Sequence, residues 1–185
     1  RPAARPTKTS RVYDRHKDLN AAFGQRYGWE RPNWFAAKGQ EPLNQYSFHT
    51  RRTNWFERVG LEVVGTRERA ALLDLTPFAK HEVSGPGAEA FLDSMVANRL
   101  PKKKGGITLA HALTPTGGVE SEFTITREDE DRFYLVSSGA AERHDHDLLL
   151  KNLPKDNSVK LVNKTMDLGT PVSYTHLRAH ETSPY

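Results

Sequence analysis

One stretch of the chain, residues 119–126, alternates strictly between side chains suited to a core and side chains suited to water. A period of two places successive side chains on opposite faces of a strand, so the pattern predicts a half-buried strand. Residues 107–113 alternate similarly, and residues 114–118 between them contain Pro and Gly, which predicts an antiparallel hairpin. The expected core face of the second strand holds Val119, Ser121, Phe123 and Ile125, and its other face holds Glu120, Glu122, Thr124 and Thr126.

The segments around this hairpin predict an α+β fold. Apolar spacing predicts helices over residues 88–96 and 140–153, the second with Leu148, Leu149 and Leu153 facing inward. Helices and strands in this order favour a two-layer α/β sandwich built on an antiparallel sheet. Further short strands are expected over residues 72–75, 80–83, 133–137 and 159–166.

All three tryptophans of the chain lie between Trp29 and Trp55, in a segment rich in Gly, Pro, Arg and Asn. Helices are expected on either side of it, over residues 10–24 and 54–71, with a loop between them. So much aromatic surface must pack against something. The residues alone favour a satellite core under that loop over a surface that docks on another domain.

The composition excludes several classes of site. The chain has no cysteine, which excludes disulfides, thiolate chemistry and Cys-ligated zinc within it. No apolar run approaches membrane-spanning length, and no secretory signal is visible. The net charge is +4, but three lysines at 102–104 are more typical of a solvated loop than of a nucleic-acid-binding stripe. An acidic run at 128–131 also interrupts any basic surface.

The last residues are read separately, because residues 172–182 match the forward translation of a transposon-end sequencing adapter. We therefore expect residues 172–185 to be non-native sequence that packs on nothing. His176 and His180 lie four apart, the spacing that puts two metal ligands on one helical face. Because both histidines lie in the expected non-native tail, we do not interpret this spacing as a metal site.

Two groups of side chains could carry chemistry. Glu120 and Glu122 share one strand face and could act as an acid–base pair, although glutamates are ordinary on a solvated strand face and that interpretation is favoured. His144 and His146 suggest a metal, but residues two apart on a helix do not face each other, so no metal site is expected. Asp145 and Asp147 suit the positive start of that helix instead, and no dinucleotide fingerprint or nucleophile elbow is present.

Six segments of the chain are distinctive: residues 13–17, 27–35, 52–60, 73–80, 83–88 and 116–126. Together they closely resemble the dimethylglycine/sarcosine dehydrogenase family of flavoproteins, and the likeness runs from about residue 12 to residue 171. In that family a folate-binding domain of the aminomethyltransferase (glycine-cleavage T protein) type follows a flavin domain. The Trp-rich segment separates this family from free-standing aminomethyltransferases.

The resemblance implies an organisation and a set of cofactors. Residues 1–57 would be an interdomain linker and Trp-rich docking segment, residues 58–171 the first part of the folate-binding domain, and residues 172–185 the non-native tail. The larger parent would oxidise an N-methylated glycine with FAD held in a missing N-terminal domain. Tetrahydrofolate would capture the one-carbon unit as 5,10-methylenetetrahydrofolate, and this chain alone would be inactive.

The resemblance also implies site residues and partners. Glu122 would be the catalytic carboxylate, in a position where many relatives carry aspartate, and Thr124, Val136 and Ser138 would line the folate site. The partners would be small molecules and the flavin domain in cis, with no nucleic acid and no membrane, in the bacterial cytoplasm or the mitochondrial matrix of a eukaryote. A flavin-free aminomethyltransferase and a non-catalytic folate-binding or assembly module remain as alternatives.

Overall fold

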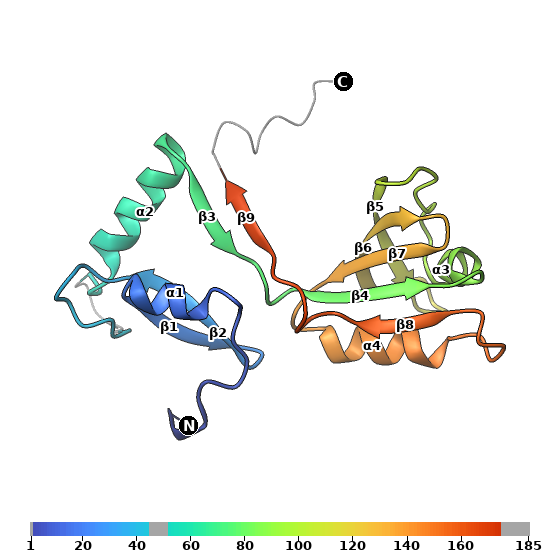
Figure 1. The fold of residues 1–185 in the computed structure, drawn as a ribbon, viewed down its shortest axis with the longest axis horizontal. Coiled ribbons are helices and arrows are strands. Elements are labelled where there is room, and N and C mark those ends of the chain that lie inside the picture. Colours follow the sequence, from blue (N-terminus) through green and yellow to red (C-terminus); the bar gives the residue numbers. More distant parts are fainter. Residues whose placement is uncertain (1, 45–51, 175–185) are drawn as a thin grey trace. The chain divides into compact units, whose positions relative to one another are not determined.

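The computed structural model describes residues 2–44 and 52–174. The chain divides into two compact units, which are described one at a time (Figure 1). The sheet unit comprises Pro77–Leu168, and the hairpin unit comprises Arg1–Thr76 together with Gly169–Tyr185. The domain boundary predicted at residue 57 stays a prediction.

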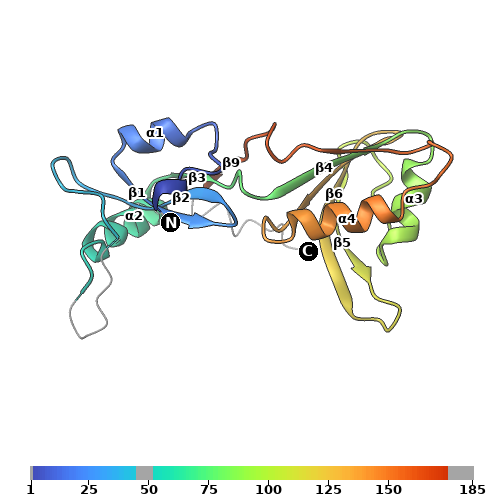
Figure 2. The same cartoon turned by 90° about the horizontal axis from the view of Figure 1, so that it is seen from below.

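The sheet unit contains one five-stranded antiparallel sheet with the order β5-β6-β7-β4-β8 (Figure 1). Helices α3 (Ala88–Met95) and α4 (Glu142–Lys151) pack on one face, since Phe91, Leu92 and Leu149 belong to the same core cluster as the inward residues of the strands. Figure 2 shows α4 running along the sheet. The strands are β4 (Ala79–Ser84), β5 (Ile107–Leu113), β6 (Val119–Asp129), β7 (Arg132–Ser137) and β8 (Lys160–Asn163).

The alternation read from the sequence places three of the four expected core residues of β6 correctly, but Val119 is exposed, because the bulge separates it from the regular part of the strand. Ser121, Phe123 and Ile125 are buried, whereas Glu120 and Glu122 are exposed. The predicted α+β class, with an antiparallel sheet covered by helices, is confirmed. One irregularity was not predicted: the register pairs Ala112 with Ser121 but Leu113 with Val119, so it skips Glu120, which lies at a β-bulge.

The hairpin unit contains strands where a loop was predicted. Strands β1 (Ala21–Arg26) and β2 (Trp29–Phe35) pair across a two-residue turn, Tyr27 and Gly28, whose φ angles are 52° and 84°. Positive φ at both positions is typical of the type I′ turn that closes tight hairpins. Helix α1 (Tyr13–Asp18) is also shorter than the helix predicted over residues 10–24, because the chain turns at Asn20 (φ 61°) and Phe23 then lies on β1.

The hairpin unit buries most of its own tryptophan surface. Trp29 and Trp34 are each 1% exposed, and Trp55 and Val59 pack against Trp34. Arg5, in the expected linker, forms an ion pair with buried Glu30. This outcome agrees with the satellite-core interpretation of the segment.

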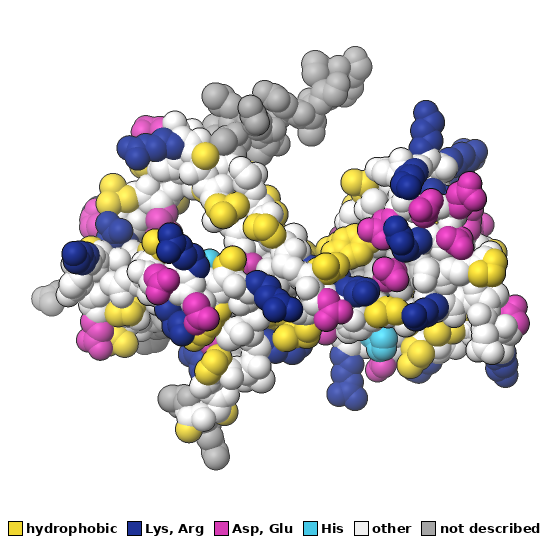
Figure 3. Space-filling model, in the orientation of Figure 1, with side chains coloured by type: hydrophobic (Ala, Val, Ile, Leu, Met, Phe, Trp, Pro, Cys, Tyr) yellow, Lys and Arg dark blue, Asp and Glu magenta, His cyan; other side chains and the backbone are white. Residues whose placement is uncertain are grey.

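Many exposed apolar residues of the hairpin unit lie on helix α2 (Phe56–Glu68) and strand β3 (Ala71–Asp74). The helix was predicted, but among its described residues none is buried. Figure 3 shows apolar side chains in yellow over this region. The exposed apolar residues there are Phe56, Leu61, Val63, Val64, Leu72 and Leu73.

The tail expectation needs a correction. Strand β9 (Pro171–Tyr174) pairs antiparallel with β3, so Val172, Ser173 and Tyr174 do pack on part of the chain. Backbone pairing needs no particular side chains, so almost any extended segment that follows Pro171 can form such a ladder. Residues 175–185 of the expected tail, with His176 and His180, lie outside the described residues.

Candidate functional site

The face of the sheet turned away from the helices carries the residues singled out from the sequence. Thr124 on β6 pairs with Val136 on β7 and with Leu109 on β5, and Val136 pairs in turn with Lys80 on β4. Partners in an antiparallel register share a face, so these four residues form one row across four strands. Glu122 lies two residues from Thr124 on the same face.

Glu122 is the exposed anion beside this row. Its side chain is 58% exposed, whereas Thr124 and Val136 are partly buried. Its Oε2 lies 3.0 Å from Nε2 of His111, which is its direct partner on β5. His111 was not singled out from the sequence, because counting outward from the turn pairs it with Ser121, and only the bulge at Glu120 brings it opposite Glu122.

Ser138 behaves differently from the other predicted site residues. It follows the last residue of β7, and its Oγ accepts a hydrogen bond from the backbone N–H of Ala140 at 3.3 Å. Its carbonyl accepts from Ala141 N–H at 2.9 Å. Ser138 therefore shapes the turn that leads into α4, at the end of the candidate face.

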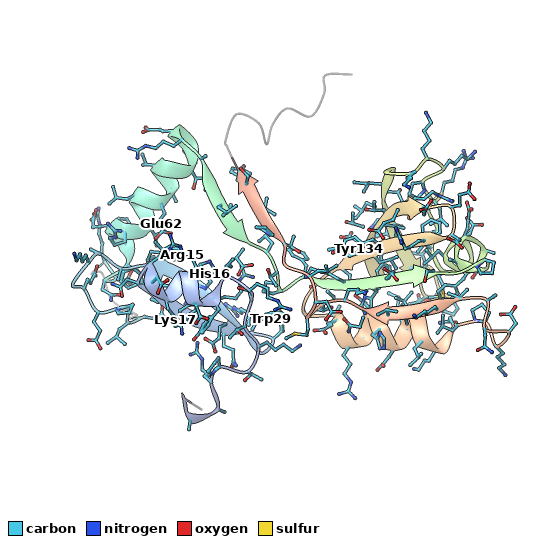
Figure 4. All side chains as sticks on the ribbon, in the orientation of Figure 1. Arg15, His16, Lys17, Trp29, Glu62 and Tyr134 are labelled. Atoms are coloured by element: carbon cyan, nitrogen blue, oxygen red, sulfur yellow. The ribbon has the colours of Figure 1, made fainter. Side chains whose placement is uncertain are left out.

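Tyr134 lies on the same face, farther along β7 (Figure 4). It pairs with Thr126 on one side and Glu82 on the other. Burial, with a smaller contribution from Glu128, raises the pKa of its phenol. Tyr134 therefore stays protonated at neutral pH and offers a hydroxyl donor to this face.

The histidine–aspartate run on α4 points to the opposite side of the sheet. Asp145 is fully buried and accepts a hydrogen bond from Ser121 Oγ at 2.6 Å, so it does not serve the helix start as predicted. His146 stacks on buried His81 with ring centroids 5.4 Å apart. Within the described part of the chain, no group of three such ligands could hold a metal ion.

A cavity of about 410 Å³ lies in the hairpin unit, lined by His16, Phe35, Glu62 and Asp74 among others, and Figure 4 labels His16 and Glu62. Its two carboxylates already have partners. Glu62 accepts a hydrogen bond from Phe35 N–H at 3.0 Å. Burial acts to raise the pKa of Asp74, but hydrogen bonds from Ser10 and Thr76 outweigh it, so the pKa is lowered. These contacts give Glu62 and Asp74 a structural role.

Across residues 2–44 and 52–174, no helix is both long and apolar enough to cross a lipid bilayer.

Comparison with known proteins covers nearly the whole chain. The family model described as the GCVT N-terminal domain matches residues 12–170. The chain is 37% identical over 169 residues to mitochondrial dimethylglycine dehydrogenase of Homo sapiens, covering 90% of this chain and 19% of the relative. It is 32% identical over 166 residues to 4-methylaminobutanoate oxidase (formaldehyde-forming) of Paenarthrobacter nicotinovorans, covering 90% of this chain and 20% of that relative. The chain thus spans about a fifth of the length of these relatives.

A solved structure shares the fold. It is the glycine cleavage system aminomethyltransferase T from Bartonella henselae, with a TM-score of 0.66 and 24% identity over 85% of this chain and 38% of that one. The homologous oxidoreductases and this fold agree with the resemblance read from the sequence. The chain belongs to the aminomethyltransferase (glycine-cleavage T protein) family, in the form found in dimethylglycine and sarcosine dehydrogenases.

Proposed function

We propose that this chain is the tetrahydrofolate-binding part of a flavin-dependent N-methyl amine dehydrogenase or oxidase of the dimethylglycine/sarcosine type. Its task is to capture the one-carbon unit as 5,10-methylenetetrahydrofolate. The observation that carries the proposal is the position of Glu122, an exposed carboxylate on the open face of the sheet beside the Leu109–Thr124–Val136 row. The names of the homologous enzymes supply the reaction class.

The residues on this face suit a pterin ring. Leu109 is 50% exposed, so an apolar side chain is available for a flat ring to cover. Thr124 beside it adds a hydroxyl, and Glu122 offers carboxylate oxygens to ring N–H groups. Val136 extends the apolar part of the row.

Tetrahydrofolate supplies two nitrogen nucleophiles that take up the one-carbon unit in place of the amine nitrogen. The carboxylate of Glu122 binds a ring N–H, orients it, and accepts a proton from it, which then passes to the departing amine. General-base assistance of this kind contributes typically about 10²–10⁴-fold in rate. Covering the site with the ring also excludes water, which would otherwise release the unit as formaldehyde.

The flavin is assigned to the part of the longer protein outside this chain. The sequence of this chain contains no Gly-x-Gly-x-x-Gly pattern, which would indicate a dinucleotide-binding site. The chain also covers only 19% and 20% of the two homologous enzymes. No step of the amine oxidation is therefore assigned to residues of this chain.

The test compares Glu122→Gln with Glu120→Gln in the full-length enzyme that carries this chain. Both glutamates are exposed on β6, but Glu120 sits at the bulge without a β5 partner in the register. With Glu122→Gln, amine oxidation should be retained, methylenetetrahydrofolate should fall by at least about tenfold, and formaldehyde should rise. Glu120→Gln should change neither product by more than about twofold.

Each rival predicts a different result. A flavin-free aminomethyltransferase would not oxidise a methylated amine in either variant. A non-catalytic module would bind tetrahydrofolate without forming methylenetetrahydrofolate. Equal yields from wild type and Glu122→Gln would remove this residue from the mechanism while leaving the chain in its family.

A further inference from the structure

We infer that His111 is a positioning residue for Glu122: its imidazole holds the carboxylate in the orientation that one-carbon transfer requires. The inference rests on the proposed function of the Glu122 face. Its starting point is the 3.0 Å contact between Nε2 of His111 and Oε2 of Glu122. Nothing else among the described residues forms a hydrogen bond to this carboxylate.

The two residues meet because the strand register brings them together. His111 and Glu122 are direct partners in the β5–β6 ladder, and the neighbouring pair on the same face is Leu109 with Thr124. Directly opposite side chains in an antiparallel pair lie with their Cβ atoms about 5 Å apart. The contact therefore follows from backbone pairing rather than from a chance approach of two long side chains.

The backbone of His111 is held from outside the ladder as well. Its N–H donates to Oδ1 of Asn98 at 2.9 Å, and its carbonyl accepts from the N–H of Ala97 at 2.9 Å. Both partners lie in the segment that follows α3, along the free edge of the sheet where β5 runs. The edge strand is therefore fixed at His111, the ladder partner of Glu122.

The chemistry of the pair explains why this geometry matters. An imidazole that donates from Nε2 engages Oε2 of Glu122 and leaves Oε1 for a ring N–H on the open face. The His111 side chain is 32% exposed, whereas that of Glu122 is 58% exposed. The imidazole is therefore the more buried partner, and the carboxylate is the more accessible to a ligand. An unheld glutamate on this face would instead sample several rotamers.

An exposed polar contact of this kind contributes little to folding stability, generally within about 1 kcal/mol. Catalysis is more sensitive, since a misplacement of about 1 Å can cost on the order of 10²-fold in rate. A positioning role therefore predicts a defect in transfer without a matching defect in folding. That difference separates this role from an ordinary surface contact.

The test uses His111→Gln and His111→Phe in the full-length enzyme. Gln keeps an N–H donor near the position of Nε2, whereas Phe keeps the ring shape and the strand propensity but removes the donor. Leu113→Ala is the matched control, since Leu113 lies two residues along β5 on the same face and pairs with Val119. The readouts are the kcat and KM for methylenetetrahydrofolate formation, together with the rate of amine oxidation.

We expect His111→Phe to lower the kcat of transfer about tenfold with little change in KM for tetrahydrofolate. His111→Gln should restore kcat to within about threefold of wild type, and Leu113→Ala should match wild type. In a double-mutant cycle, His111→Phe should add no further loss to Glu122→Gln, because the histidine acts only through the carboxylate.

Three results would overturn the inference. The first is a wild-type kcat of transfer in His111→Phe, and the second is a loss of kcat in His111→Gln as large as in His111→Phe. The third is a loss in the double variant equal to the product of the two single losses. If Glu122→Gln is defective while His111→Phe is not, the proposed function stands and the positioning role fails. If Glu122→Gln itself transfers normally, the proposed role of the carboxylate fails and the inference fails with it.

Discussion

His81 lies on the face of the sheet that α4 covers, and its side chain has no access to water. Its side chain is 0% exposed and neither ring nitrogen has a hydrogen-bond partner among the described residues. Burial, together with a smaller effect of neighbouring His146, lowers the pKa of His81 from 6.5 to about 4, while Asp145 and Glu142 act in the opposite direction. His81 is therefore neutral in the native state at any pH near 7.

We expect the free energy of unfolding to fall as the pH falls from about 6.5 to 4. The unfolded chain takes up a proton on His81 near pH 6.5, whereas the folded chain takes it up only near pH 4. The contribution of neutral His81 to the free energy of unfolding is therefore complete above pH 6.5 and is lost as the pH falls toward 4. The loss should approach about 3 kcal/mol, measured by urea unfolding followed by circular dichroism. His81→Leu should flatten this part of the profile, and an unchanged slope would refute the assignment.

Two buried serines on the core face provide a matched pair. Ser121 donates to Asp145, whereas Oγ of Ser137 is buried without a hydrogen-bond partner among the described residues. Ser121→Ala should destabilise the protein by about 1–3 kcal/mol, because the buried Asp145 carboxylate loses one of its two polar partners, the other being Nδ1 of His144 at 3.1 Å. Ser137→Ala should be neutral or stabilising, since it removes an unpaired polar group. The measurement is urea unfolding at pH 7, and similar losses in both variants would contradict this account.

At the scale of elements, the turn from β4 into α3 depends on a close backbone approach. Gly85 has a φ of 115°, its N–H donates to Asp131, and a Cβ at this position would clash with the carbonyl oxygen of Ser158. Gly105 also has a positive φ, 78°, but a Cβ there would enter open space.

Alanine at these two glycines should therefore have unequal effects. Gly105→Ala should cost about 1 kcal/mol for the backbone conformation alone, and Gly85→Ala should cost more than about 2 kcal/mol because the segment around Ser158 must also move. Thermal unfolding of the two variants checks this. If the Gly85→Ala protein is as stable as Gly105→Ala, the contact between residue 85 and the carbonyl oxygen of Ser158 does not restrict the side chain at this position.

The sheet was more predictable than the hairpin unit for physical reasons. Alternation identified the faces of β6 because one face is buried and the other meets water. The β1–β2 hairpin was missed because its turn is Tyr27-Gly28 rather than an Asn-Gly pair, and because Pro32 lies within β2. Its pairing is supported by buried Trp29 and Trp34 rather than by local propensity.

The candidate site was predicted in part. Glu122 and Thr124 could be placed on one face from their spacing, and the structure agrees. His111 and the bulge at Glu120 depend on the register between strands, which alternation along a single strand does not define. The buried position of Asp145 was missed because a charge near a helix start is usually solvated.

At the scale of the whole chain, deletion of residues 172–185 tests the meaning of β9. Its ladder partner is β3, in the hairpin unit, and a two-stranded ladder is marginal by itself. Removing these residues should speed hydrogen exchange of the β3 amides and leave the sheet unit protected to within about 0.5 kcal/mol. Weakened protection of β6 or β7 in exchange mass spectrometry would show that the tail supports the sheet.

The placement of the tryptophans has a practical consequence for observing this protein. Trp29, Trp34 and Trp55 are the only indoles in the chain, and all three fall in the hairpin unit. Intrinsic emission at the red edge of the excitation spectrum will therefore report on one unit alone, with two of its three fluorophores shielded from aqueous quenchers. The sheet that carries Glu122 and His111 is spectroscopically silent in this experiment, so a single indole introduced there would give it a signal of its own.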